Sequence, residues 1–116
     1  MAQYTILHNP RCSKSRQTLA LLEENGLDFE VLEYLKTPPT QKQLKTILSL
    51  LDAEPRDIMR KGEAEYKESG LNDDTLSKAE QVKLMVAFPK VIERPIVFSQ
   101  QKAIVGRPPE NVLKLV

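Results

Sequence analysis

The sequence predicts an α/β domain built on one four-stranded sheet that mixes parallel and antiparallel strands. Three observations lead to this prediction. Short runs of β-branched and apolar residues lie near the two ends of the chain, helical periodicity dominates its middle, and the elements run strand–helix–strand, helices, strand–strand–helix. The length fits a single domain, residues 1–116, with a helical insertion at about 40–89 between the second and third strands.

The first part of the chain predicts a strand, a helix and a second strand. The apolar run at 4–7 has the composition of a strand, and the leucine-rich segment at 18–22 predicts a helix after the loop at 8–16. The Asn-Gly pair at 25–26 is typical of a helix end. The residues at 29–34 again have strand character.

Two capping boxes predict helices in the middle of the chain. Thr40 and Gln43 form the first box, and Ser77 and Glu80 form the second. The first precedes apolar residues at i, i+3, i+4 and i+7, which predict an amphipathic helix with a buried stripe: Leu44, Ile47, Leu48 and Leu51. The second precedes a helix with a shorter apolar face: Val82, Met85 and Val86.

Shorter elements fill the space between these two helices. We expect helical turns at 55–60 and 63–69, followed by a loop at 70–74. Pro89 ends the last helix, because proline lacks the N–H that a continuing helix needs. No strand-like run occurs here, so we expect the whole insertion to lie outside the sheet.

The last quarter of the chain predicts a hairpin and a final helix. Two β-branched runs, at 95–98 and 103–105, surround a polar segment at 100–102. The Pro-Pro pair at 108–109 starts a helix whose apolar side holds Val112, Leu113 and Val116. A strand–helix–strand unit and a strand–strand–helix unit that share one sheet form the thioredoxin-like arrangement.

Charge and composition exclude several classes of protein. Seventeen basic and sixteen acidic side chains give a net charge of +1, which does not suggest a nucleic-acid or membrane surface. No apolar run approaches the about 20 residues that a membrane helix needs, and the N-terminus lacks the features of a signal peptide. The single cysteine cannot form an internal disulfide. We therefore expect a cytoplasmic protein, and we expect it to be a monomer.

The loop at 8–16 holds the only cysteine and the only histidine of the chain. At the start of a helix, unpaired N–H groups and the helix dipole favour the thiolate form of Cys12, and basic side chains of the loop add positive charge. The same N–H groups suit a tetrahedral oxyanion. We expect Ser13 or Ser15 to cap this helix. The alternative for Cys12 is an inert, buried cysteine.

Five blocks of sequence, taken in order, carry a resemblance to a known family. They are His-Asn-Pro-Arg-Cys-Ser-Lys-Ser-Arg at 8–16, Tyr34-Leu35 with Pro38-Pro39, Met-Arg-Lys at 59–61, Glu-Arg-Pro-Ile-Val at 93–97 and Gly-Arg-Pro at 106–108. Together they resemble the ArsC family of glutaredoxin-coupled arsenate reductases over nearly the whole chain. The ordered set is far more specific than a lone C-x-x-S.

The resemblance implies a role for each site residue. Cys12 is the nucleophile that attacks arsenate, and three arginines hold the oxyanion: Arg60, Arg94 and Arg107. His8 is tied to the acidity of the thiol, with a structural histidine at a strand end as the alternative. Ser15 and Arg16 are supporting residues, and a solvated surface charge is the alternative for Arg16. The peptide bond before Pro95 is expected to be cis, beside the active cysteine.

The residue types suit this chemistry. A thiolate and arsenate repel each other, and arginines neutralise the oxyanion and orient it through paired hydrogen bonds. A chain with one cysteine must obtain its electrons from outside thiols. The resemblance implies glutathione as co-substrate, glutaredoxin as partner and arsenite as product. We expect no metal, no tightly bound cofactor, and no nucleic-acid or membrane partner.

Two other functions compete with this interpretation. Spx-like regulators share the fold, bind RNA polymerase and sense redox state, but their switch is C-x-x-C and Ser15 stands at the second position here. An ArsC-like thiol oxidoreductase with a different substrate would keep the fold and the site. The phosphatase-type reductase loop, C-x5-R, is not matched, because Arg16 follows Cys12 at C-x3-R.

Overall fold

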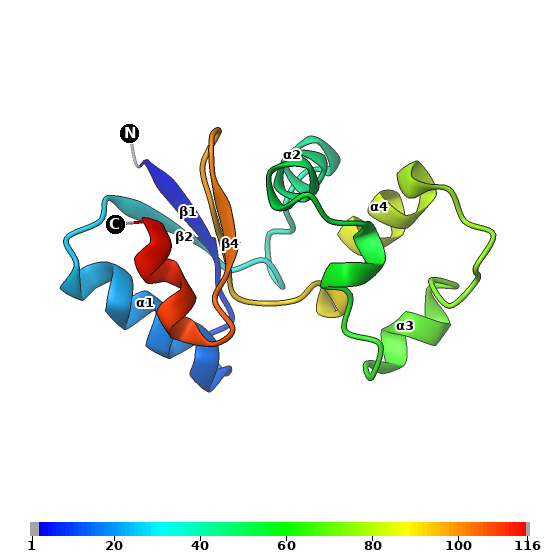
Figure 1. Ribbon diagram of the computed structural model, residues 1–116. Coiled ribbons are helices and arrows are strands. Elements are labelled where there is room, and N and C mark those ends of the chain that lie inside the picture. Colours follow the sequence, from blue (N-terminus) through cyan, green and yellow to red (C-terminus); the bar gives the residue numbers. More distant parts are fainter. Residues whose placement is uncertain (1–2, 116) are drawn as a thin grey trace. The chain divides into compact units, whose positions relative to one another are not determined.

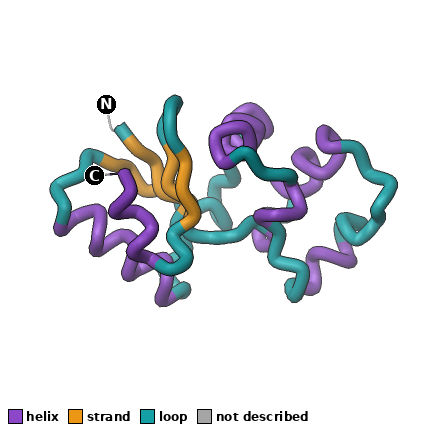
Figure 2. Tube along the Cα trace, viewed as in Figure 1, coloured by secondary structure: helices purple, strands orange, loops and turns teal. Residues whose placement is uncertain are grey.

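The computed structural model describes residues 3–115, which form two compact units. The sheet unit contains the residues up to Thr37 and those from Arg94 onwards, and the helical unit is Pro38–Glu93. Among the described residues, strands occur in the sheet unit alone, and the helical unit consists of helices and loops (Figures 1 and 2). The predicted α/β class with one four-stranded mixed sheet is confirmed.

The four strands form one sheet in the order β2-β1-β3-β4: β1 (Tyr4–Leu7), β2 (Phe29–Leu32), β3 (Ile96–Phe98) and β4 (Ala103–Val105). β1 pairs in parallel with β2 and antiparallel with β3, and β3 pairs antiparallel with β4. Ile6 lies opposite both Val31 and Val97, so β1 is a central strand. The predicted hairpin and the thioredoxin-like arrangement are both confirmed.

The core of the sheet unit lies between one face of the sheet and two helices, α1 (Ser13–Glu24) and the 3-10 helix η3 (Pro109–Leu115). Tyr4 and Ile6 are two residues apart on β1 and therefore face the same side. Leu22 of α1 and Val112 of η3 complete the centre of this cluster. A fully buried large apolar side chain contributes about 1.5–3 kcal/mol. This packing holds α1, and the loop that precedes it, against the sheet.

The helical unit contains three α-helices and two 3-10 turns: α2 (Gln41–Leu51), η1 (Pro55–Ile58), α3 (Ala64–Glu68), α4 (Lys78–Ala87) and η2 (Pro89–Val91). Both predicted capping boxes are confirmed. The N–H of Gln43 donates to Thr40 Oγ1 at 3.0 Å, and the N–H of Glu80 donates to Ser77 Oγ at 3.1 Å. Within Pro38–Glu93, every residue of which is described, the only β pairing is an isolated bridge between Met59 and Ile92.

The apolar stripes of α2 and α4 form the core of the helical unit. Leu44, Ile47 and Leu48 are buried as predicted, and α2 packs against α4, where Val82 and Met85 are buried. The last members of the two predicted stripes, Leu51 and Val86, are only partly buried. No helix within residues 3–115 combines the length and the apolar content needed to cross a membrane.

Two details of the first strand–helix–strand prediction are wrong. Neither Ser13 nor Ser15 caps α1, because Cys12 is the N-cap residue and the helix begins at Ser13, without a capping side-chain hydrogen bond. The strand predicted at 29–34 ends at Leu32. A turn follows, in which the Glu33 carbonyl accepts the N–H groups of the residues three and four positions later.

Two helical predictions also need correction. The turn predicted at 55–60 ends at Ile58, because Met59 takes an extended conformation and pairs with Ile92. The final helix buries Val112 and Leu115 instead of Leu113, which is 42% exposed. A 3-10 helix has three residues per turn, so positions i and i+3 share a face. Val116, also assigned to the apolar side, lies outside the described residues.

Candidate active site

Cys12 lies where β1 has ended and α1 begins. Its backbone is extended, with φ −94° and ψ 122°, and it occupies the N-cap position of a 12-residue helix. The Cys12 N–H donates to the Asn9 carbonyl at 3.0 Å, so the loop turns tightly just before the helix. The residue is only partly buried. The thiol therefore lies at a helix N-terminus, as the sequence predicted, and within reach of solvent.

Arg107 brings a positive charge to the sulfur from a distant part of the chain. Its Nη2 lies 3.6 Å from Cys12 Sγ, across 95 residues of sequence. Its Nε donates to the Arg94 carbonyl at 2.7 Å. The guanidinium is thus held by the backbone on one edge while another edge meets the sulfur. Of the three predicted arginines, two belong to the sheet unit, where the Arg107 side chain meets the backbone of Arg94.

Both of these arginines precede cis proline bonds. The Arg94-Pro95 bond is cis, as expected from the resemblance, and the Arg107-Pro108 bond is cis as well. The second cis bond was not predicted. Pro95 leads into β3 and Pro108 leads into η3. The two arginines therefore lie at the ends of the hairpin that β3 and β4 form.

His8 directly follows β1 and is fixed by Ser15. The His8 Nδ1 and Ser15 Oγ are 2.6 Å apart, and the N–H of Asn9 donates to the same oxygen at 3.0 Å. The Ser15 hydroxyl has one hydrogen and two lone pairs, so it can accept from Asn9 and still bond to the His8 ring, whose tautomer sets the direction of that bond. Ser15, fully buried in α1, ties the loop to the strand that precedes it.

The environment of His8 favours its neutral form. Burial lowers the pKa of His8 below its ordinary value of 6.5; the Glu33 carboxylate opposes this shift and the Arg16 charge adds to it. A neutral imidazole contributes hydrogen bonds to the loop instead of a positive charge. The hydrogen-bond partner of His8 is Ser15, so the structural alternative has direct geometric support. The predicted link between His8 and the acidity of the thiol stays a prediction.

Arg16 is exposed but it is not simply a solvated charge. Its Nη1 donates to the Pro10 carbonyl at 2.8 Å and so closes the loop from the first turn of α1. The N–H of Arg11 donates to Asn9 Oδ1 at 3.0 Å within the same loop. Arg16 therefore supports the site by holding the loop that carries Cys12.

Arg60 belongs to the helical unit. Its N–H donates to the Val91 carbonyl at 2.7 Å, and its guanidinium forms an ion pair with Glu63. The two side chains of this pair are 31% and 30% exposed. The structure thus gives Arg60 an acidic partner within its own unit. Its predicted part in holding an oxyanion stays a prediction.

Sequence reasoning missed a close contact that supports the site. The N–H of Gly106 donates to the Pro95 carbonyl at 2.9 Å. A Cβ at Gly106 would lie 2.7 Å from Thr18 Oγ1 and 2.8 Å from Pro95 Cγ. Only glycine lets α1 approach the turn that carries Arg107 so closely. The Gly-Arg-Pro block drew attention to the position, but the reason for the glycine lies in Thr18, 88 residues away.

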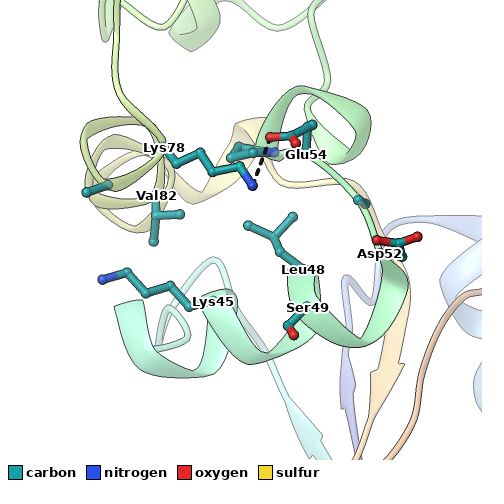
Figure 3. A pocket seen from close by; sticks show the side chains of 10 residues that line it. Lys45, Leu48, Ser49, Asp52, Glu54, Lys78 and Val82 are labelled. Atoms are coloured by element: carbon teal, nitrogen blue, oxygen red, sulfur yellow. Dashed lines mark ion pairs between the residues drawn. The ribbon is translucent and has the colours of Figure 1, made fainter.

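The helical unit holds a cavity of about 510 Å³ between the second half of α2 and the start of α4 (Figure 3). Leu48 and Val82 form an apolar part of its lining, and Lys78 closes one side through an ion pair with Glu54 at 3.2 Å. Its lining contains none of the predicted site residues and no cysteine or histidine. The predicted nucleophile, Cys12, and two of the three predicted arginines belong to the sheet unit instead.

The arrangement around Cys12 suits attack on an anion. A soft sulfur nucleophile lies at a helix N-terminus with a guanidinium beside it, and both features favour negative charge at this point. Within residues 3–115, no group of three or more histidine, cysteine, aspartate or glutamate side chains is placed to hold a metal ion. The thiol and the guanidinium beside it are suited to thiol chemistry on an oxyanion.

Comparison with known proteins gives a consistent result. The sequence pattern of the ArsC family matches residues 7–115. The uncharacterized protein YfgD of Escherichia coli K12 is 50% identical over 115 residues, which cover 98% of this chain and 97% of that protein. The arsenate reductase of Neisseria meningitidis serogroup B is 46% identical over 113 residues, covering 97% of each.

A solved structure agrees with these sequence relationships. The arsenate reductase from Vibrio cholerae superimposes with a TM-score of 0.91 at 46% identity, covering 99% of this chain and 98% of that chain. Almost the whole chain is therefore shared, including the helical unit as well as the sheet unit.

Proposed function

The chain belongs to the ArsC family, and we propose that it is an arsenate reductase with Cys12 as its nucleophile. Relatives named arsenate reductase that match it along nearly its whole length support the proposal. The single observation that carries it is the 3.6 Å separation between Arg107 Nη2 and Cys12 Sγ. A guanidinium at that distance can hold an oxyanion while the sulfur attacks its central atom.

The first step is attack of the Cys12 thiolate on the arsenic atom. A sulfur–arsenic bond forms, and one arsenate oxygen leaves as water after it takes up protons. The arsenic keeps its oxidation state, so this step needs no electrons. Arg107, and Arg94 beside it, neutralise charge on the remaining oxygens, which lowers the repulsion between two anions. The resemblance adds Arg60 as the third arginine.

The second stage is reduction by thiols from outside the chain. Reducing arsenic(V) to arsenic(III) takes two electrons, which two thiols supply when they become one disulfide. With Cys12 as its only cysteine, the chain cannot supply them itself. We propose that glutathione attacks the arsenic atom of the arsenylated cysteine and displaces water, which forms a glutathione–arsenic bond. A glutaredoxin thiol then attacks the glutathione sulfur, a glutathione–glutaredoxin disulfide leaves, and its electron pair reduces the arsenic to arsenic(III). Water breaks the remaining sulfur–arsenic bond, so that arsenite leaves and Cys12 returns to its thiol form.

An arsenate reduction assay with purified protein, glutathione and glutaredoxin tests the proposal. We expect arsenite to form with the parent protein, and Cys12→Ser to reduce turnover by at least about 10³-fold, because a residue that forms the covalent intermediate has no substitute. A thermal melt of Cys12→Ser serves as the control for folding.

The choice of reducing partner is tested in the same assay. Thioredoxin with its reductase replaces glutathione and glutaredoxin in a parallel reaction. Turnover with thioredoxin alone contradicts the proposed partner but leaves the proposed substrate intact. Absence of arsenite with both reducing systems contradicts the proposed substrate.

A further inference from the structure

The short segment 105–107 carries Arg107 between β4 and η3, and its backbone groups need partners beyond the sheet. Buried or partly buried carbonyls outside helices and strands normally accept hydrogen bonds from side chains or water. The Gly106 N–H donates to the Pro95 carbonyl at 2.9 Å. The Thr18 hydroxyl donates to the Lys14 carbonyl at 2.8 Å and lies 3.4 Å from the Gly106 carbonyl. The middle of the segment is therefore anchored to the start of β3 and lies close against α1.

A single side chain anchors the two ends of this segment. The Nδ2 of Asn111 donates to the Val105 carbonyl at 3.2 Å and to the Arg107 carbonyl at 3.0 Å. A primary amide has two N–H groups, and both are used here, one on each side of Gly106. Asn111 lies in η3, so it reaches back from the helix to the turn that precedes it.

These bonds determine where the Arg107 guanidinium can lie. The carbonyl and the side chain of Arg107 leave adjacent backbone atoms, so fixing the carbonyl restricts the direction of the side chain. The guanidinium then meets the Arg94 carbonyl and the Cys12 sulfur. We propose that Asn111 is a positioning residue that holds Arg107 at the Cys12 sulfur. This inference adds a residue to the proposed function, and the arsenate assay that tests it depends on that function.

A chemical probe measures the charge beside Cys12 without any arsenate. Iodoacetate and iodoacetamide both alkylate a cysteine, but only iodoacetate is an anion. A guanidinium near the sulfur favours iodoacetate, so the ratio of the two alkylation rates reports the position of Arg107. One unit of charge about 4 Å away changes this ratio by about fivefold even in a water-like medium. Cys12 is the only thiol of the chain, so the rates need no correction for other sites.

Four variants test the proposal against this probe. Arg107→Met removes the charge, and Asn111→Leu removes both N–H donors while keeping a similar side-chain size. The double variant shows whether the two residues act through each other. Asn25→Leu is the matched control, because the Asn25 amide also donates to a backbone carbonyl, that of Leu21 at 2.8 Å, but at the opposite end of α1 from Cys12.

We expect Arg107→Met to lower the iodoacetate preference by about fivefold. We expect Asn111→Leu to lower it by at least about twofold, because the loss of its two hydrogen bonds lets the Arg107 side chain take other positions. In the Arg107→Met background, Asn111→Leu should have no further effect. Asn25→Leu should leave the ratio unchanged. Thermal melts accompany each variant, and Asn111→Ser, which keeps one donor, replaces Asn111→Leu if the latter does not fold.

Two results would overturn the proposal. An unchanged ratio in Asn111→Leu, with a loss of stability like that of Asn25→Leu, means that Asn111 supports the fold only. An equal fall of the ratio with and without Arg107 means that Asn111 does not act through Arg107.

The arsenate assay separates this inference from the proposed function. If the parent reduces arsenate, Asn111→Leu should raise the KM for arsenate more than it lowers kcat, because it misplaces a group that binds the oxyanion. If the parent does not reduce arsenate while the alkylation ratios follow the expected pattern, the proposed function is wrong and the role of Asn111 stands.

Discussion

Each of the two compact units contains an arginine that donates to the backbone, but the two arginines connect it to different groups. In the helical unit, Arg56 donates through Nη1 to the Leu71 carbonyl and through Nη2 to the Asp73 carbonyl, both at 2.7 Å. In the sheet unit, Arg107 donates through Nε to one carbonyl and directs Nη2 at a sulfur. Arg56 joins η1 to a loop, whereas Arg107 joins the backbone to a nucleophile.

The difference shows how a structural arginine and a site arginine can be told apart. Both side chains have the same charge and the same donors, and both meet carbonyls at equal distances. What distinguishes them is the last partner in the network, a peptide oxygen in one unit and the Cys12 thiol in the other. We therefore expect substitutions in the two units to separate stability from binding.

The largest effect is expected at Arg107. Arg107→Lys keeps the charge but loses the paired donors, so we expect oxyanion affinity to fall by about 10- to 100-fold, since a hydrogen bond to a charged group contributes about 1.5–3 kcal/mol. Sulfate and arsenate binding by calorimetry measures the change. The melting temperature should alter little. Arg94→Lys and Arg60→Lys should weaken binding too, and whichever of the three binds like the parent does not hold the oxyanion.

The opposite pattern is expected at Arg56. Arg56→Lys cannot reach both the Leu71 and the Asp73 carbonyls, so we expect the free energy of unfolding to fall by about 1–1.5 kcal/mol. Urea unfolding measures this loss. The iodoacetate preference of Cys12 should not change. A change in that preference would show that the helical unit contributes to the charge at the thiol, and the distinction between the two arginines would not hold.

A pair of glycines gives the next effect. Gly106→Ala places a Cβ too close to Thr18 and Pro95, and overpacking of this kind typically costs about 1–3 kcal/mol. In the helical unit, Gly62→Ala meets no atom within 4 Å and should be close to neutral. Chemical unfolding of both variants tests the contrast. Equal stabilities would mean that the approach of α1 to the Gly106 turn is not tight.

The smallest effect is a pH dependence that originates at His8. Its pKa is lowered in the folded protein, mainly by burial, so the unfolded chain binds more protons once the pH falls below 6.5. The free energy of unfolding should therefore fall as the pH drops through 6.5 and level off below the lowered pKa. Above 6.5 the imidazole is neutral in both states and has no such effect.

His8→Asn isolates this contribution, because His8 is the only histidine. Urea unfolding between about pH 7.5 and 5 should show a flatter dependence for the variant than for the parent. Parallel curves would mean that His8 is protonated as easily in the folded protein as in the unfolded chain. Asp73 and Glu80 do not interfere, since their pKa values are lowered from already acidic values, Asp73 mainly by Thr75 and Glu80 mainly by Ser77.

The comparison between units also explains how much of the fold was predictable. The helices of the helical unit follow from local signals: the Thr40 and Ser77 capping boxes and the spacing of the apolar residues on α2. The strands and the hairpin follow from short β-branched runs at the chain ends. Helix caps at Ser13 or Ser15 were predicted wrongly, because Ser15 is bound instead to His8 and Asn9.

The candidate site was only partly predictable. Cys12 at a helix start follows from the order of a strand, a loop and a helix, and Arg107 was singled out by its block of sequence. Thr18 and Asn111 gave no signal in the sequence, and the Gly106 block did not show why a glycine is needed, because the importance of these residues comes from contacts between segments that are far apart or irregular. Arg56 was not singled out either, although it joins loops 15 and 17 residues away.

The burial of Ser15 has a consequence for how such a loop can evolve. Replacing this serine by cysteine changes one atom and would create a C-x-x-C pair on paper. That atom, however, is completely buried and holds both the Asn9 N–H and the His8 ring. Sulfur is larger and a weaker acceptor, so the replacement would loosen the loop before it supplied a second thiol. The packing of this loop therefore opposes the replacement of Ser15 by a second thiol, and the proposed need for thiols from outside the chain would not be removed by this single mutation.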